Sequence, residues 1–134
     1  MTLPVTALTA AICALLLIIL MFKTIGERLR TETNFGTVDD ERFAMVRGAH
    51  GNLAENAPLA IIMLGVLELA NAHHMALTGL AALFLVSRVL HAFGMFQHQA
   101  GKTTRFRQAG VLGSALSMAA MALWIIYLFV TVNL

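Results

Sequence analysis

Long uncharged apolar runs constrain this chain more than any other feature of its sequence. One spans residues 4–22, and another extends from residue 108 to the C-terminus. A helix needs about 20 such residues to cross the ~30 Å hydrocarbon core of a bilayer. Only 12% of the residues are charged and 59% are hydrophobic, whereas soluble domains are about one quarter charged. The sequence therefore predicts an integral membrane protein.

The apolar runs and the polar segments between them predict four helices in a single domain, residues 1–134. The acidic residues 39–41 suit the first turn of the second helix, because carboxylates stabilise the positive end of a helix dipole. Gly101 is the expected turn residue of the loop before the fourth helix. Short loops favour antiparallel neighbours. We expect an all-α, antiparallel four-helix membrane bundle, with helices over about residues 4–27, 40–70, 75–96 and 105–131.

Basic residues fall in two clusters, around the first and the third connection. They are Lys23, Arg28, Arg30, Arg42 and Arg47 in the first cluster, and Arg88, Lys102, Arg105 and Arg107 in the second. The positive-inside rule makes both connections cytoplasmic, which places both termini on the outer side. This distribution explains the basic isoelectric point by membrane topology, so we expect no nucleic-acid partner.

Polar residues interrupt the second expected helix where it enters the membrane. Asn52 and Glu55 are three residues apart, so they share one helix face, which Leu59 continues. Arg47 lies at the edge of that face, and His50 points nearly the opposite way. Ionisable groups at membrane depth are costly, and they indicate a functional site with a partner.

The third expected helix carries a second polar pair, Arg88 and His91, which also share a face. Arg88 would lie at a depth similar to that of Glu55, so a buried ion pair that fixes helix register is one interpretation. The surplus of cations at this membrane face favours another, a cavity for a substrate with carboxylates, which arginine binds bidentately. Anchoring to anionic lipid headgroups is the alternative use of any single exposed arginine.

Two further patterns are structural. Gly110, Gly113, Ser114 and Ser117 form a stripe of small residues that allows close helix packing. The neighbouring histidines His73 and His74 lie in the expected outer loop, and adjacent side chains diverge by about 100° on a helix. With no further ligand residues nearby, we expect solvated loop histidines and no metal site.

Three segments together resemble the MAPEG family (membrane-associated proteins in eicosanoid and glutathione metabolism), in its small bacterial branch. The helix-2 signature of the family, Asn-x-x-Glu-x-x-Pro after an Ala-His pair, matches residues 49–58. The other two segments are Ser-Arg-Val-Leu-His-Ala-Phe-Gly-Met at 87–95 and Arg-Phe-Arg-Gln-Ala-Gly at 105–110. The resemblance covers nearly the whole chain and implies four spans in a bacterial inner membrane.

The resemblance also implies a homotrimer that holds glutathione between subunits near the cytoplasmic face. It implies a transferase or peroxidase that uses glutathione as co-substrate against hydrophobic electrophiles. A guanidinium at the start of the fourth helix would face the thiol; Arg107 matches best and Arg105 is the alternative. A nearby cation lowers a thiol pKa from about 8.5 and so supplies thiolate at neutral pH. The candidate glutathione-binding residues are Arg28, Arg30, Arg47, His50, Asn52, Glu55, Arg88 and His91.

Two alternatives stay open. A small transporter could exchange protons through Glu55 for a cationic substrate. A non-catalytic family member could use its polar helices only to specify assembly. The sequence has His91 and Met95 where family members of the eicosanoid pathway carry tyrosines, and Asn56 where many relatives carry tyrosine. Arg47 also lies five residues before Asn52, whereas well-studied members place the arginine four before.

Overall fold

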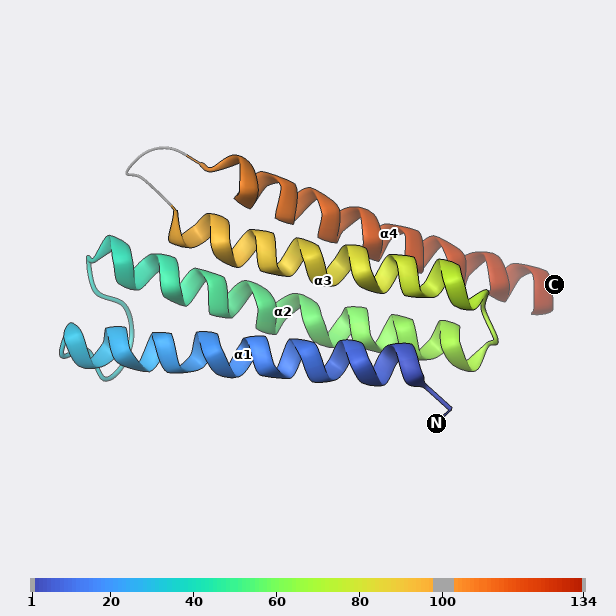
Figure 1. The fold of residues 1–134 in the computed structure, drawn as a ribbon, viewed down its shortest axis with the longest axis horizontal. Coiled ribbons are helices and arrows are strands. Elements are labelled where there is room, and N and C mark those ends of the chain that lie inside the picture. The colour runs from blue at the N-terminus through green and yellow to red at the C-terminus, as the bar shows by residue number, and fades with distance from the viewer. Residues whose placement is uncertain (1, 98–102, 134) are drawn as a thin grey trace.

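A computed structural model describes residues 2–97 and 103–133 of the chain, and these residues form four helices (Figure 1). All four helices are long and apolar enough to cross a membrane. The expected all-α, antiparallel membrane bundle is therefore confirmed. Helix α1 extends to Arg30 rather than residue 27, and the expected turn at Gly101 lies outside the described residues, as does Lys102. The helices are α1 (Pro4–Arg30), α2 (Glu41–Leu69), α3 (His74–Phe96) and α4 (Arg105–Asn133).

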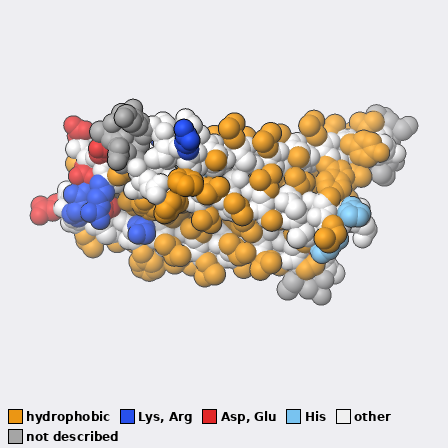
Figure 2. All heavy atoms as spheres, turned by 45° about the horizontal axis from the view of Figure 1, so that its top comes forward, with side chains coloured by type: hydrophobic (Ala, Val, Ile, Leu, Met, Phe, Trp, Pro, Cys, Tyr) orange, Lys and Arg blue, Asp and Glu red, His pale blue; other side chains and the backbone are white. Residues whose placement is uncertain are grey.

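The helices lie side by side in chain order, with the N- and C-termini at the same end of the bundle (Figure 1). The most extensive contacts join α3 to α4 and α1 to α2. Lysine, arginine, aspartate and glutamate side chains gather at the opposite end, whereas hydrophobic side chains are spread over the rest of the visible surface, with histidine at the end that carries the termini (Figure 2). We call these the inner end and the outer end, following the orientation that the positive-inside rule predicts.

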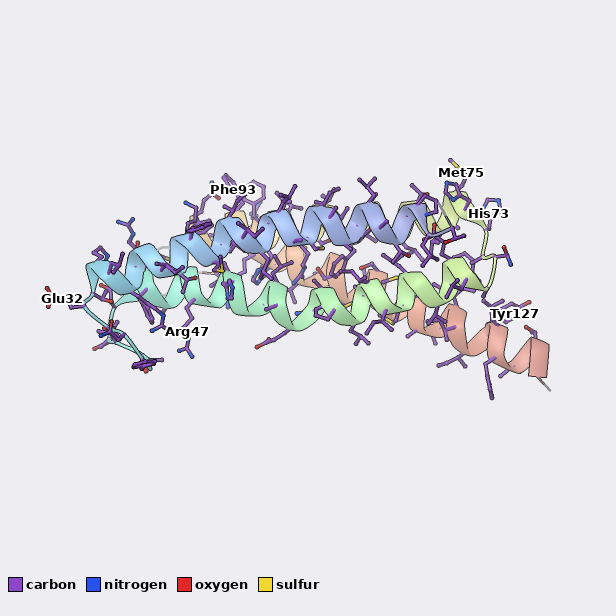
Figure 3. The ribbon with its side chains drawn as sticks, turned by 90° about the horizontal axis from the view of Figure 1, so that it is seen from below. Glu32, Arg47, His73, Met75, Phe93 and Tyr127 are labelled. Carbon is purple, nitrogen blue, oxygen red and sulfur yellow. The ribbon has the colours of Figure 1, made fainter. Side chains whose placement is uncertain are left out.

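Side chains distinguish the two ends further. Arg47 lies towards the inner end, whereas His73, Met75 and Tyr127 lie at the outer end (Figure 3). His73 and His74 are both exposed, as expected, although His74 is the first residue of α3 rather than part of the loop. His73 has an additional role, because its Nδ1 accepts a hydrogen bond from the Ala76 amide at 3.4 Å and so caps the first turn of α3.

Glycine contacts bring α3 and α4 together at the inner half of the bundle. A Cβ atom at Gly110 would lie 2.6 Å from the Ser87 carbonyl oxygen and 2.7 Å from the His91 Cα. A Cβ atom at Gly94 would lie 2.8 Å from the Arg107 Cα. Such distances leave no room for a side chain, so the two backbones touch. The small-residue stripe of α4 therefore packs as the sequence predicts.

At the outer end a carboxylate joins α1 to α2. Glu68 accepts hydrogen bonds from the backbone amides of Val5 and Thr6, both at 2.9 Å, and from the Thr6 hydroxyl at 2.7 Å. The first amides of a helix lack partners within the helix, and they carry the positive end of its dipole. Glu68 therefore caps α1 from a neighbouring helix and fixes the register of the two helices.

Candidate functional site

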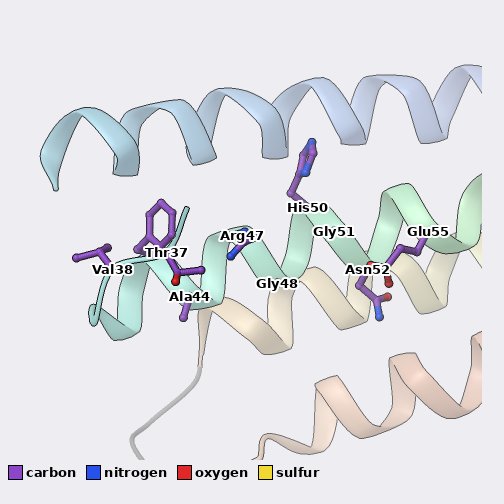
Figure 4. A pocket seen from close by; sticks show the side chains of 10 residues that line it. Thr37, Val38, Ala44, Arg47, Gly48, His50, Gly51, Asn52 and Glu55 are labelled. Carbon is purple, nitrogen blue, oxygen red and sulfur yellow. The ribbon is translucent and has the colours of Figure 1, made fainter. Parts of the chain in front are cut away.

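A groove of about 510 Å³ lies along the inner half of α2 and is bordered by the loop that precedes the helix. Arg47 and Glu55 are exposed in it, whereas His50 and Asn52 are half-buried. His50 points towards α1, and Asn52 and Glu55 leave α2 on another side, as the helical spacing predicts (Figure 4). The lining residues are Thr37, Val38, Phe43, Ala44, Arg47, Gly48, His50, Gly51, Asn52 and Glu55.

Two glycines on α2 line this groove and have different surroundings. A Cβ atom at Gly51 would meet nothing within 4 Å, so the space beside it is free. A Cβ atom at Gly48 would lie 2.8 Å from the Cε of Met95, so its absence lets α3 approach. At Gly51 a ligand could therefore approach the backbone of α2 closely, whereas the space at Gly48 is occupied by the Met95 side chain.

Arg88 occupies the centre of the inner half and links three helices. Its side chain is buried, with 4% of its surface exposed. Nη1 donates to the Asn52 side-chain oxygen on α2, and Nη2 donates to the Ser114 hydroxyl and, at 3.0 Å, to the Gly110 carbonyl on α4. The guanidinium carbon also lies 5.6 Å from the centre of the Phe84 ring. Arg88 therefore holds Asn52 at the floor of the groove.

The expected ion pair between Arg88 and Glu55 does not form. Glu55 lies on the exposed side of α2 and makes no hydrogen bond or ion pair with any described residue. Arg88 lies between the helices instead, because the contact at Gly110 brings acceptors on α4 within its reach. Its Nε has no partner within the described part of the chain. The interpretation of Arg88 as the ion-pair partner of Glu55 was wrong, because Arg88 binds the neutral acceptors Asn52 and Ser114 and a backbone carbonyl instead.

This arrangement leaves Arg88 without a carboxylate partner among the residues that the structure describes. Glu27 pairs with Arg30 and Arg42, and Asp40 pairs with Arg30, so none of these three ion pairs involves Arg88. Buried charges are normally paired, because removing them from water is costly. Asn52, Ser114 and a carbonyl stabilise the guanidinium of Arg88 but do not neutralise it. The site therefore favours an anion.

The two arginines that begin α4 differ in position. Arg107 is half-buried and borders a smaller cavity of about 170 Å³, together with Glu41, Ala44, Met45 and Met95. Arg105 is exposed and borders none of the cavities described here. His91 is buried, makes no hydrogen bond with the described residues, and lies near enough to Arg88 and Arg107 to interact electrostatically. The structure thus places Arg107, and not Arg105, beside the α2 face.

Arg28 and Arg30 organise the loop before α2 rather than line the groove. Arg28 donates to the carbonyls of Thr33 and Asn34 at 3.3 and 3.2 Å. Arg30 contacts Glu27 and Asp40, at 2.6 Å each. The hydrogen bond from Arg30 to Asp40 is the main reason that the pKa of Asp40 lies below its usual value, and the hydrogen bond from the Phe43 amide lowers it further. Both arginines therefore act on the groove through the loop segment that carries Thr37 and Val38.

Sequence reasoning missed two parts of this site. It treated Ser114 as a packing residue, although the Ser114 hydroxyl accepts from Arg88. It also assigned no role to Glu27, which is buried and contacts Arg30 and Arg42. The role of Ser114 could have been inferred from its position within the membrane span. A serine within a small-residue stripe can accept a hydrogen bond from an arginine on the helix that packs against it.

Comparison with known proteins supports the family assignment. The MAPEG family model matches residues 6–127. The chain is 28% identical to the inner membrane protein YecN of Escherichia coli K12 over 122 residues. The aligned region covers 89% of this chain and 88% of the relative. The protein of the same name from Escherichia coli O6:H1 strain CFT073 has the same identity and coverage. The chain therefore belongs to the MAPEG family and is a multi-pass integral membrane protein of the bacterial inner membrane.

Proposed function

We propose that the α2 groove binds glutathione, and that the protein transfers this thiol to hydrophobic electrophiles or uses it to reduce hydrophobic peroxides. The observation that carries the proposal is the uncompensated cation Arg88 behind Asn52 in an open groove. A volume of about 510 Å³ lies within the range of small-molecule sites, roughly 300–1,000 Å³. Family membership supports a role in glutathione or eicosanoid metabolism.

Several polar groups of glutathione have a complementary residue at this site. Its two carboxylates suit guanidinium groups, which bind carboxylates through paired hydrogen bonds. Arg47, exposed in the groove, is the first candidate for one of them. The α-amino group suits Glu55, whose carboxylate has no partner among the described residues. Asn52, held by Arg88, offers its amide nitrogen to the peptide backbone of the ligand.

Arg107 is the candidate for activating the thiol. A guanidinium beside a thiol lowers the thiol pKa and increases the thiolate fraction at neutral pH. The thiolate attacks the electrophilic carbon, a C–S bond forms, and the leaving group departs with its electron pair. With a peroxide, two glutathione molecules become the disulfide while the peroxide is reduced to an alcohol and water. In both reactions the protein supplies charge and position.

The proposal includes a homotrimer in which neighbouring subunits close the groove. Glu55 and Arg47 are exposed on a helix that is long and apolar enough to span the membrane. Charged side chains at membrane depth face other protein or a water-filled cavity rather than lipid. A second copy of the chain against this face of α2 would shield both groups and complete the walls of the site.

The alternative of a proton-coupled transporter for cations is less well supported. Glu55 has no partner among the described residues, as such a carrier would need. However, Arg47 lines the same groove as Glu55, and Arg88 contacts Asn52, which lies three residues before Glu55 on α2. Their positive charge would repel a cationic substrate.

Turnover of glutathione with a hydrophobic electrophile, in Arg107→Ala and Arg105→Ala variants, tests this function. Loss of a group that stabilises a developing anion costs roughly 10²-fold in kcat. We expect this loss for Arg107→Ala and nearly unchanged turnover for Arg105→Ala, with the oligomer intact in both. Unchanged turnover in a folded double variant would contradict the arginine mechanism.

A further inference from the structure

A second groove at the inner end lies between α1, the first turns of α2 and the end of α3. Its volume is about 460 Å³, and it shares no residue with the α2 groove. We call it the α1–α2 groove. Its lining residues are Lys23, Gly26, Glu27, Arg30, Arg42, Met45, Val46 and Phe96.

The α1–α2 groove has more cations than anions and keeps hydrogen-bond donors free. Glu27 pairs with Nε of Arg30 at 2.6 Å and with Nε of Arg42 at 2.7 Å. The terminal nitrogens of Arg42 make no hydrogen bond with the described residues, and its side chain is 69% exposed. Lys23 pairs with no described carboxylate, and its Nζ lies 5.1 Å from the centre of the Phe96 ring. Lys23 and Arg42 can therefore both donate to an added anion.

Exposed apolar side chains continue from this groove along the bundle. Residues that are 4, 7 or 11 positions apart share a helix face. Ile19 and Ile12 therefore continue the Lys23 face of α1, and they are 54% and 37% exposed. Val89 continues the Phe96 face of α3 and is 53% exposed. Because α1 and α3 also touch, the basic groove opens onto an apolar surface that two neighbouring helices provide.

We propose that the α1–α2 groove binds one anionic phospholipid. The lipid phosphate lies against Lys23 and Arg42, and the acyl chains follow the apolar faces of α1 and α3. Such a lipid has an anionic headgroup next to two long apolar tails, and the protein likewise has a basic groove next to an extended apolar surface. Anionic lipids of the cytoplasmic leaflet are attracted by about 1 kcal/mol per nearby lysine or arginine, an advantage that a zwitterionic headgroup does not gain.

Lipid retention by the purified full-length protein tests the proposal. The protein in mild detergent receives either phosphatidylglycerol or phosphatidylcholine, and native mass spectrometry counts the retained lipid while a thermal melt records stabilisation. We expect preferential retention of phosphatidylglycerol and a higher melting temperature with it. Lys23→Gln should lower that retention about fivefold, which corresponds to the loss of one interfacial charge. This variant keeps both ion pairs of Glu27, which do not involve Lys23.

Arg105→Gln is the matched control, because it removes one exposed positive charge outside the groove. It should retain phosphatidylglycerol as the unchanged protein does, and Lys23→Arg should restore the retention that Lys23→Gln loses. Equal retention of the two lipids, or equal losses in Lys23→Gln and Arg105→Gln, would overturn the proposal. Stabilisation by inorganic phosphate equal to that by phosphatidylglycerol would also overturn it, since the site would then serve a soluble anion.

Discussion

The inner and outer ends of the bundle each carry a charged side chain between helices, and the two side chains differ in how completely their hydrogen-bonding groups are satisfied. At the outer end, both oxygens of Glu68 accept hydrogen bonds from the first turn of α1. At the inner end, Arg88 has neutral acceptors and an Nε with no described partner. A fully satisfied charge indicates a structural joint, whereas an uncompensated one marks a place for a ligand.

The cavities at the two ends follow the same division. The groove at the outer end has a volume of about 290 Å³ and is lined mainly by apolar residues of α1 and α3, such as Leu8, Ala81 and Leu85. The two larger grooves at the inner end both contain arginine. The comparison teaches that the outer end carries a satisfied structural joint, whereas the inner end combines close helix packing with the candidate site.

The largest effect is expected from separating α3 and α4 at the inner end. In Gly110→Val the new side chain meets the backbone of Ser87 and His91, and overpacking of this kind costs about 3 kcal/mol or more. We expect severe loss of folded protein, measured by thermal unfolding in detergent. The control is Gly79→Val on α3, where a Cβ atom meets nothing within 4 Å. Equal stability of the two variants would contradict the close backbone contact between α3 and α4 at Gly110.

Arg88→Leu tests the polar centre of the inner end. It removes the donor that the half-buried Asn52 and the buried Ser114 share, although Ser114 still donates to the Gly110 carbonyl. A buried polar group left unsatisfied costs about 1–3 kcal/mol. In a double variant with Asn52→Leu, the unmatched amide disappears together with the guanidinium. We therefore expect the double variant to be less destabilised than the sum of the single variants, as measured by a double-mutant cycle of unfolding free energies. Strict additivity would mean that the two side chains do not interact.

Glu68→Ala tests the joint at the outer end. It removes three hydrogen bonds to a charged acceptor and should cost about 2 kcal/mol. Because the joint is structural, glutathione binding at the inner end should keep its affinity in the folded variant. Stability from chemical unfolding and affinity from titration calorimetry check the two parts. A marked loss of affinity without a loss of stability would reverse the roles assigned to the two ends.

The smallest effect is expected at the cap of α2. Asp40 accepts a hydrogen bond from the Phe43 amide at 2.7 Å, and Asp40→Ala should lower the melting temperature slightly at pH 7. The hydrogen bond from Arg30 lowers the folded-state pKa of Asp40 from the ordinary 3.8. The stabilisation is thus present above that pH and is lost as the pH falls through the folded pKa. Melts should show the difference from the unchanged protein shrinking below about pH 4; a difference that grows there contradicts this assignment.

The four helices were predictable because each depends on a local property. A run such as residues 4–22 is long and apolar enough to span a bilayer whatever its neighbours are. The shared face of Asn52 and Glu55 follows from helical spacing alone. The small residues of α4 likewise indicate close packing before any partner helix is known.

The contacts between helices were not predictable, because they depend on register. Arg88 and Glu55 lie at similar depth, but the backbone contact at Gly110 directs the guanidinium towards α4 and Asn52 instead. Glu68 falls within the expected second helix and lies in α2, but its contact with the start of α1 was not predicted. Its role requires the start of α1 to lie opposite the end of α2, which helical periodicity within each segment does not specify.

Calorimetric titration of glutathione into the purified protein, across pH 6 to 9 and in two buffers of different ionisation heat, tests the central claim most directly. The α2 groove, with Arg47 in its lining and Arg88 behind Asn52, should bind glutathione saturably and release a proton below the free thiol pKa of about 8.5. Glu55→Gln should weaken binding, whereas Gly79→Val should not. Absence of saturable binding by the folded protein would contradict the claim that the inner end is a glutathione site.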